Sequence, residues 1–353
     1  MDSDGSVVPE HGGSPAVNPA ILERLSDLDK RIVVALQGDG RASWRAVADT
    51  VGAPVTTVVR RGQQLLADGV VRVAVVPALA ADGRYDSFLV RINTKPGEHI
   101  AVAAALVDNP DVRFVTLVTG SYDVIAELIV RGGATRYPRI IGELQSIQGV
   151  ERWRSDLILH VYKVSFDWGR QLYGGHFEVD ADREVGTAAE LEDCAPEHFD
   201  EADRSILSAL RDDGRETFQN IADRVGLNES SVRRRYDRMR AARCVDVLTL
   251  IPSAALGMEA ETLLTVTVHP SRLEEVAREL ARYPAVRYLA ALLDENALLC
   301  EVIAPSATEL HTFITESLAH LDGVSGWTAS MELLYLKRGF VETPWWRSQL
   351  GYS

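Results

Sequence analysis

The sequence predicts an α+β protein made of a tandem repeat, in which each half has a winged or three-helix helix-turn-helix unit followed by a ferredoxin-like βαββαβ domain. Two observations support this prediction. Residues recur at a constant offset of 174 positions: residues 39–41 (Asp-Gly-Arg) return at 213–215, and Trp153 returns as Trp327. Each half also passes from short helices to strands and helices in the order βαββαβ.

This pattern divides the chain into segments. The first residues are rich in Gly, Ser and Pro, and the connection between the halves is acidic with little periodicity, so neither is expected to form a packed core. The expected segments are a disordered N-terminus (1–25), the first helix-turn-helix unit (26–76), the first βαββαβ domain (84–165), an acidic linker (166–199), the second helix-turn-helix unit (200–248), the second βαββαβ domain (258–337) and a C-terminal tail (338–353).

The first helix-turn-helix unit has clear helix starts. Ser26 and Ser43 are good N-cap residues, and Pro54 is a favoured residue in the first turn of the third helix. Gly62 stands in this third helix where the second half has Tyr236. An interior glycine costs a helix about 1 kcal/mol, so the first copy is expected to be the weaker of the two.

The third helix of the second unit, residues 226–243, is the most informative stretch. Asn228 is expected to cap it, and Val232, Tyr236 and Met239 form one buried stripe. An isolated arginine-rich helix is more often a solvated face, but the two preceding helices put this one in the recognition position of a helix-turn-helix. The candidate DNA contacts are therefore Ser230, Ser231, Arg233, Arg234, Arg235 and Arg238, with Thr56, Thr57, Arg60, Arg61 and Gln64 in the first copy.

Each βαββαβ domain is expected to form one antiparallel sheet with both helices on one face. The other sheet face is apolar and uncovered, so we expect the two sheets to pair within the chain. The tail aromatics Trp345, Trp346 and Tyr352 are expected to pack onto their own domain. The predicted strands are 88–92, 112–119, 124–130 and 150–164, then 263–268, 286–293, 297–303 and 324–337; the predicted helices are 98–107, 136–147, 272–283 and 308–321.

Composition constrains the partners and the compartment. The net charge of −14 argues against a nucleic-acid partner, but basic residues gather in 228–243 and much of the acid lies in 167–200. The three cysteines form no CxxC pair or Cys/His cluster, so neither a disulfide framework nor a metal site is expected. No apolar run reaches the length of a membrane span and no signal peptide is evident, which favours a cytoplasmic protein without a membrane partner.

The helix-turn-helix residues resemble a known family. Asp29, residues 39–41, Ala48 and Arg61, with their counterparts in the second half, are similar to the Lrp/AsnC (feast/famine) transcription regulators. The resemblance covers residues 27–164 and 200–337. It implies a sequence-specific regulator that binds double-stranded DNA, with βαββαβ (RAM-type) domains that pair sheet to sheet and bind an amino acid or related small-molecule effector. One chain would act as a covalent pseudo-dimer, and a homo-oligomer would be a dimer of pseudo-dimers.

The family's effector motif is a glycine followed three residues later by aspartate, in the turn between the second and third strands. It matches Gly120 and Asp123, and the candidate effector residues are Thr119, Gly120, Ser121, Tyr122 and Asp123. A glycine with positive φ can expose N–H groups to a carboxylate, and an aspartate can receive an ammonium. The second half has Asp294 and Glu295 at this turn, which should repel a carboxylate, so one effector site per chain is expected.

Other functions remain open. The turn can be an ordinary β-turn. Some proteins of this architecture resemble siroheme decarboxylases, which would need histidines and arginines around the sheet-interface cavity; His160 is the only histidine on a candidate cavity strand. A third possibility is a small-molecule sensor that does not bind DNA. The leading prediction is a regulator that is not an enzyme and has no cofactor apart from its effector.

Overall fold

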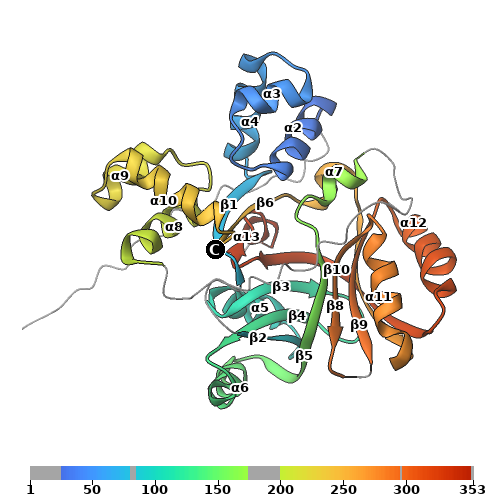
Figure 1. Ribbon diagram of the computed structural model, residues 1–353. Helices are drawn as coiled ribbons and strands as arrows, with labels where there is room; N and C mark the ends of the chain where they lie inside the picture. The colour runs from blue at the N-terminus through green and yellow to red at the C-terminus, as the bar shows by residue number, and fades with distance from the viewer. Residues whose placement is uncertain (1–24, 80–84, 174–198, 295, 351–353) are drawn as a thin grey trace, which may run out of the picture.

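The computed structural model describes residues 25–79, 85–173, 199–294 and 296–350, which form two helix-turn-helix units above a single β-barrel (Figure 1). The predicted disordered N-terminus lies almost wholly outside these residues. The first unit comprises α2 (Asp27–Gly38), α3 (Trp44–Val51) and α4 (Val55–Ala67). The second comprises α8 (Glu201–Asp212), α9 (Phe218–Val225) and α10 (Glu229–Ala241).

Capping side chains explain where these helices begin. Ser26 and Asp200 form capping boxes with the residues three positions later, Asp29 and Asp203. The Asn228 side chain accepts a hydrogen bond from the Ser231 N–H at the start of α10. The predicted caps at Ser26, Ser43 and Asn228 are therefore confirmed.

A two-stranded ribbon joins the helix-turn-helix units. Strand β1 (Arg72–Pro77) pairs antiparallel with β6 (Val245–Leu250). In this register Ala74 lies opposite Leu248, its own counterpart in the repeat. A pseudo-two-fold axis therefore passes through the ribbon and relates the two halves of the chain.

The remaining strands form one closed barrel. The sheet order is β11-β10-β3-β4-β2-β5-β8-β9-β7, and β10 also pairs with β7, which closes the ring. Lys163 pairs with Leu289 at one junction between the halves, and Lys337 with Val115 at the other. The first half contributes β2 (Tyr85–Thr94), β3 (Val112–Val118), β4 (Val124–Arg131) and β5 (Val150–Val164), and the second half β7 (Ala260–Val268), β8 (Val286–Leu292), β9 (Ala297–Ala304), β10 (Val324–Arg338) and β11 (Val341–Glu342).

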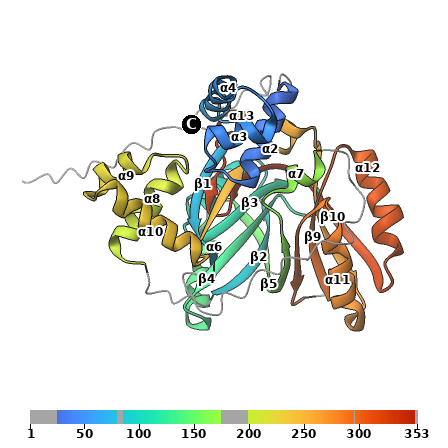
Figure 2. The ribbon, with the colours of Figure 1, turned by 45° about the horizontal axis from the view of Figure 1, so that its top comes forward.

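The predicted pairing of the two sheets within the chain is confirmed. Their inner faces share an apolar core that includes Leu89, Ile125 and Ile158 from the first half and Leu263 and Leu299 from the second. The helices cover the outside of the barrel (Figure 2). These are α5 (His99–Asp108) and α6 (Tyr137–Ser146) in the first half, and α11 (Leu273–Arg282) and α12 (Ala307–Thr312) in the second.

The helix predicted over 308–321 is not continuous. After α12 the chain forms a π-helical turn, η6 (Phe313–Ser317), and a 3-10 turn, η7 (Leu318–His320). Phe313 and Leu318 are both buried, and their spacing of five residues matches the i to i+5 hydrogen bonding of a π-turn. The wider turn therefore keeps both side chains in the core.

The predicted acidic linker begins later than expected. Trp168–Leu172 form a short helix, α7, with Trp168 5% exposed, and the Gly169 N–H donates to Gln37 Oε1 of α2 at 2.9 Å. The apolar Trp168 and Leu172 bury this turn against the first helix-turn-helix unit. The acidic residues 174–198 lie outside the described residues.

The C-terminal tail packs onto the protein as predicted. Trp345 and Trp346 are 1% and 0% exposed, in the core below the first helix-turn-helix unit and in the core under α5 respectively. The helix α13 (Trp346–Gln349) ends this segment. Tyr352 lies outside the described residues.

Candidate DNA-binding surface and effector site

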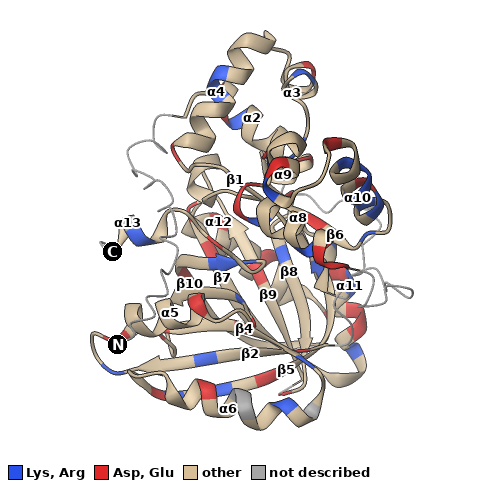
Figure 3. Ribbon diagram, turned by 90° about the vertical axis from the view of Figure 1, so that its left-hand side faces the viewer, with Lys and Arg blue, Asp and Glu red and all other residues tan. Residues whose placement is uncertain are grey.

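Helix α10 presents an arginine-rich outer face. Its predicted stripe of Val232, Tyr236 and Met239 is buried in the core of the second helix-turn-helix unit, which fixes the rotation of the helix. Ser230 and Arg234 are consequently exposed on the opposite side. Figure 3 shows basic residues gathered on α10, with fewer on α4.

Several of the candidate arginines are held by carboxylates. Arg235 pairs with Asp200 at 2.7 Å and with Asp203 at 3.0 Å, and Arg238 pairs with Asp203 at 2.6 Å. Asp203 is fully buried, so these pairs fasten α10 to α8. Arg233 pairs with Glu229 on its own helix at 2.8 Å. Arg234 makes no ion pair with any described residue, which leaves its guanidinium available to an outside anion.

The first helix-turn-helix unit has the same ion pair between its third and first helices, but its third helix lacks the arginine-rich outer face of α10. Arg61 contacts buried Asp29 at 3.1 Å, as Arg235 contacts Asp203, so both arginines join the third helix to the first. Arg60 is exposed, and Thr57 is half-buried. Thr56 and Gln64 are also exposed, and Gln64 Nε2 donates to Asp68 at 2.7 Å. Helix α4 therefore offers fewer charges to a partner than α10 does.

Gly62 has a packing role that the sequence pattern did not predict. A Cβ atom at this position would lie 2.2 Å from the Trp44 ring. In the second half the counterparts of Trp44 and Gly62 are Phe218 and Tyr236, whose rings lie 5.3 Å apart. One large ring in the first unit thus replaces two smaller rings in the second.

The two Asp-Gly-Arg motifs hold the units together. Arg41 donates to the Gly214 carbonyl and lies over the Phe218 ring at 4.7 Å. Reciprocally, Arg215 donates to the Gly40 carbonyl and lies over the Trp44 ring at 4.2 Å. Burial lowers the pKa of both arginines from the usual value, although nearby aspartates oppose this shift. This reciprocal clasp fixes the two units relative to each other.

The predicted effector turn has the expected backbone. Gly120 has φ of 96°, and the Thr119 N–H donates to the Met331 carbonyl of β10 at 2.9 Å, so the second half closes over the turn. The Asp123 carboxylate accepts hydrogen bonds from the Thr94 N–H at 2.7 Å and the Thr94 hydroxyl at 3.1 Å. Asp123 therefore already has a structural role in the first half.

A cavity of about 180 Å³ lies beside this turn. Ser121 and Tyr122 line it, whereas Thr119, Gly120 and Asp123 do not. Asp294, from the equivalent turn of the second half, lines the same cavity and is ion-paired with Arg154. Both turns therefore meet at one cavity, and there Arg154 pairs with the Asp294 carboxylate that was expected to repel a ligand carboxylate. Glu295 lies outside the described residues.

A smaller cavity, of about 60 Å³, lies in the barrel near the helix-turn-helix units, beside buried charges. Its lining includes Arg113 and Glu127 from the first half and Arg287, Glu301 and Arg338 from the second. Burial alone would raise the pKa of Glu301, but Arg287 and Arg338 outweigh it and hold that pKa far below its usual range. Burial beside Glu301 raises the pKa of Glu332 well above its usual value.

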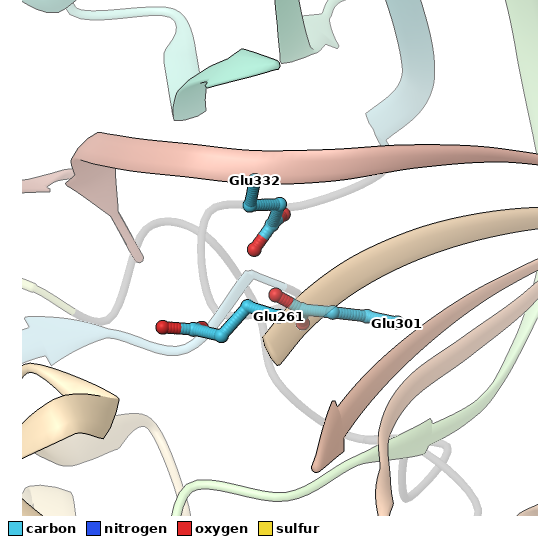
Figure 4. A group of neighbouring side chains, drawn as sticks. All are labelled: Glu261, Glu301 and Glu332. Carbon is cyan, nitrogen blue, oxygen red and sulfur yellow. The ribbon is translucent and has the colours of Figure 1, made fainter. Parts of the chain in front are cut away.

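Glu261, Glu301 and Glu332 converge in a way that could suit a metal ion (Figure 4). One oxygen from each lies within 4.8 Å of the others. However, Arg287 Nη2 lies 2.6 Å from Glu261 and 3.6 Å from Glu332, and it also donates to Glu301. A guanidinium therefore occupies the position a cation would need, and the donor set does not fit a metal.

No histidine lines either of these two cavities among the described residues. His160 is exposed on β5, with its ring 4.6 Å from that of Tyr162. Arginines line both cavities, including Arg154 in the larger and Arg287 in the smaller. No helix among the described residues is long and apolar enough to cross a membrane.

Family comparisons agree with the architecture. The profile of the AsnC-type helix-turn-helix domain matches residues 25–66 and 199–240, and that of the Lrp/AsnC ligand-binding domain matches residues 87–167 and 261–340. An uncharacterised helix-turn-helix transcriptional regulator of Pyrococcus horikoshii is 30% identical over 144 residues, which are 40% of this chain and 91% of the relative. The regulator LrpA of the same organism is 29% identical over 128 residues, 36% of this chain and 91% of the relative.

One solved structure has the same fold over nearly the whole chain. The siroheme decarboxylase NirDL aligns with 92% of this chain and 97% of its own, with a TM-score of 0.57 and 14% sequence identity. Identity this low shows a shared fold alone. Because the matched family profiles together cover most of the sequence, the chain belongs to the Lrp/AsnC family of helix-turn-helix transcription regulators, as a tandem duplication of the family's two-domain unit.

Proposed function

We propose that this regulator reads DNA as a covalent pseudo-dimer whose two recognition helices recognise unlike half-sites. The observation that carries the proposal is the reciprocal Arg41 and Arg215 clasp, which fixes two third helices of different surface chemistry about one pseudo-two-fold axis. Helix-turn-helix dimers meet half-sites about one duplex turn apart. Here both recognition helices, α4 and α10, belong to one polypeptide and differ in sequence, so the half-sites need not be identical.

The exposed residues support different base preferences. Arg234 on α10 suits guanine, whose O6 and N7 accept a bidentate guanidinium, and Ser230 can bond to several bases or a phosphate. On α4, Gln64 suits adenine and the Thr56 methyl suits a thymine methyl, with Arg60 as the main charge. Arg61 and Arg235, which hold buried aspartates, are expected to position their helices more than to contact DNA.

Replacing Arg234 by alanine tests this assignment. If Arg234 contacts a base, Arg234→Ala should weaken specific binding by about 1–3 kcal/mol, and Arg60→Ala should cost less. If either arginine meets only phosphate, the loss should be similar on all sequences and the salt dependence should fall. Fluorescence anisotropy over a salt series, on fragments enriched from genomic DNA, measures both effects.

Arg278→Ala serves as the control, because Arg278 is exposed on α11 outside the barrel and away from both helix-turn-helix units. Unchanged affinity and salt dependence for Arg234→Ala combined with Arg238→Ala would contradict the proposed surface. Failure of the wild-type protein to enrich any DNA would instead favour a sensor that does not bind DNA.

The effector is proposed to be an amino acid, bound once per chain near Thr119 to Asp123. The support is the positive φ of Gly120 and the closure of the turn by β10. Titration calorimetry with Asp123→Asn separates the roles of this residue. Loss of binding with the Thr94 contacts preserved would support direct recognition of the ammonium, whereas unchanged binding would reduce Asp123 to a turn residue.

Assembly beyond one chain is proposed through the outer barrel surface. Leu159 and its counterpart Leu333 are 55% and 61% exposed, which is unusual for large apolar residues on strands. Light scattering of the wild type and of Leu159→Ser with Leu333→Ser tests this; a monomeric wild type contradicts it.

A regulator of chromosomal DNA acts where that DNA is, so we place the protein in the cytoplasm.

The tetrapyrrole-enzyme alternative is the second candidate, because of the likeness to NirDL. Cavities of about 60 and 180 Å³ are smaller than the roughly 300–1,000 Å³ pockets that hold drug-sized ligands. No histidine of the described ranges lines either cavity, which also argues against it. We therefore propose that the protein is not an enzyme, and a visible absorbance change on adding siroheme would contradict this.

A further inference from the structure

The second half of the chain has a buried carboxyl group that the first half lacks. Glu332 lies on β10, and its counterpart in the repeat is the apolar Ile158 of β5. The Glu332 side chain is 1% exposed, so water does not solvate it. A carboxylate at an apolar position of a barrel wall is costly unless it is paired with a cation or holds a proton. The groups around Glu332 therefore decide which form is stable.

Charged groups surround Glu332 on four strands. Glu261 on β7 and Glu301 on β9 converge with it (Figure 4), and one oxygen from each of the three lies within 4.8 Å of the others. Arg287 on β8 and Arg338 on β10 supply the cations, and the residue paired with Glu332 on β3 is apolar. Two guanidiniums face three carboxyl groups, so this cluster balances its charge only if one carboxyl group is protonated.

The two arginines are already bound to the other two carboxylates. Arg287 Nη2 lies 2.6 Å from Glu261 and also donates to Glu301, and Arg338 Nη2 lies 2.5 Å from Glu301. The same two nitrogens are 3.6 and 4.0 Å from Glu332, beyond hydrogen-bonding distance. Neither oxygen of Glu332 has a hydrogen-bond partner in the part of the chain that the structure describes. Glu332 is therefore the carboxyl group that is left without a cation.

This cluster also contacts the segments that attach the helix-turn-helix units to the barrel. The hydroxyl of Ser253, three residues after β6, donates to Glu261. Arg287 lies over the Trp168 ring of α7 at 5.9 Å, and Trp168 belongs to the core of the first helix-turn-helix unit. A charge that appears on Glu332 acts on Arg287 and Glu261, and through them on both attachments.

From this arrangement we propose that Glu332 is a proton-binding site that makes DNA binding depend on pH. In the protonated form the two guanidiniums balance the other two carboxylates, and the attachments at Ser253 and Trp168 are intact. Loss of the proton adds a third carboxylate, which competes for the arginines and loosens both attachments. DNA affinity therefore falls as the pH rises. The link to DNA rests on the function proposed above, whereas proton binding by Glu332 does not.

Glu332→Gln tests proton binding, because glutamine keeps the shape of the protonated acid and cannot ionise. Burial and the neighbouring Glu301 raise the pKa of Glu332 well above 4.5. From pH 4.5 up to the folded-state pKa, the folded wild type holds a proton that the unfolded chain has lost, so its stability falls with pH. The folding constant of the wild type, divided by that of the variant, should fall about tenfold per pH unit in this range.

Urea denaturation at each pH measures this ratio, and the contribution of Lys337 cancels because both proteins contain it. Glu332→Ile, which restores the residue of the first half, should remove the pH dependence as well. Glu275→Gln is the control, because Glu275 is exposed on α11 outside the barrel, and it should keep the wild-type profile. A wild-type to Glu332→Gln ratio that does not change with pH overturns the proposal.

Infrared difference spectroscopy detects the proton itself. The wild type should show the carbonyl stretch of a buried protonated carboxylic acid at a pH where the ratio is still falling, and Glu332→Gln should lack this band. The same band in both proteins, or in neither, would assign the proton elsewhere and overturn the proposal.

DNA affinity over the same pH range tests the link to function. The wild type should lose affinity about fivefold or more as Glu332 ionises, the low end of the usual coupling between two sites, and Glu332→Gln should keep its affinity. Parallel profiles for the two proteins overturn the link. Failure of the wild type to bind DNA at any pH overturns the regulator function and the link together, while the stability and infrared measurements still decide proton binding.

Discussion

The two helix-turn-helix units share one backbone but fill it differently. The first packs Trp44 over Gly62, and the second packs Phe218 beside Tyr236 at the same positions. A larger aromatic ring at one position is compensated by the loss of the ring at the other, and the arrangement of the helices is the same. Close-packed cores tolerate such compensating changes in volume. The comparison shows that the two cores have changed at pairs of positions that contact each other. The effect of Gly62 on its helix therefore cannot be judged without Trp44.

The units also differ in their attachment. The first is packed against α7 and shares its core with Trp345 of the tail. Among the described residues, those that the core of the second takes from outside the unit lie in or next to the ribbon, such as Val75, Ala78 and Val245. Both are joined by the same clasp. The first unit is thus fixed to the barrel, and the second is fixed mainly to the first.

The barrel interior shows the same divergence. Arg113 and Glu127 in the first half pair at 2.5 Å, and their counterparts Arg287 and Glu301 sit in a larger network with Glu261, Glu332 and Arg338. Arg287→Met should destabilise the protein by about 3–5 kcal/mol, because it leaves several buried carboxylates without their main cation. Arg113→Met should cost less. Urea denaturation compares them, and equal losses would show that the larger network adds no stability.

The last long strand of each half carries a buried lysine, Lys163 in β5 and Lys337 in β10. Lys337 Nζ donates to the Val107 and Asn109 carbonyls of the first half, as its counterpart Lys163 donates to Tyr283 of the second. Burial, with help from Arg211, lowers the pKa of Lys337 from 10.5 to about 8. Between these values the unfolded chain holds a proton that the folded chain lacks, so stability should rise with pH.

Lys337→Met removes this rise. Relative to the variant, the wild type should gain about 3 kcal/mol of unfolding free energy between pH 8 and pH 10.5. Denaturant titrations of both proteins across this range give the difference directly. Parallel pH profiles would show that the folded lysine keeps its ordinary pKa.

Gly62→Ala tests the diverged core. Alanine would favour the helix by about 1 kcal/mol, but its Cβ would overlap the Trp44 ring and overpacking costs about 1–3 kcal/mol. We expect net destabilisation, relieved when Trp44→Phe is added. Gly38→Ala is the control, because Gly38 also lies in a helix and a Cβ there meets nothing within 4 Å. Stabilisation by both substitutions would show that Trp44 does not require the glycine.

Local signals made most of the fold predictable. The stripe of Val232, Tyr236 and Met239 and the Asn228 cap define α10, because helix caps and apolar spacing act within a few residues. The five-residue helix α7 gave no such signal within an acidic segment. Its burial depends on the packing of Trp168 and Leu172 against the first helix-turn-helix unit, which lies far away in the sequence.

The sites were less predictable because their residues meet only through the fold. The sequence predicts Arg235 and Arg238 as DNA contacts, but in the structure both form ion pairs with the buried Asp203. Arg91, Arg154 and Asp156 were missed as cavity residues, although charged residues at alternating positions of a predicted strand were a usable signal for a polar interior. The ion pair of Asp294 with Arg154 was also not predictable, because Arg154 comes from the other half of the chain.

The central claim is that the two recognition helices recognise different half-sites. Its most direct test is selection of bound sequences from a random DNA library with the wild-type protein and with Arg234→Ala. We predict an asymmetric motif of two unlike half-sites about one duplex turn apart, with a guanine in one half that loses its preference in the variant. A palindromic motif with identical halves, or a variant that selects the wild-type motif unchanged, would contradict the account.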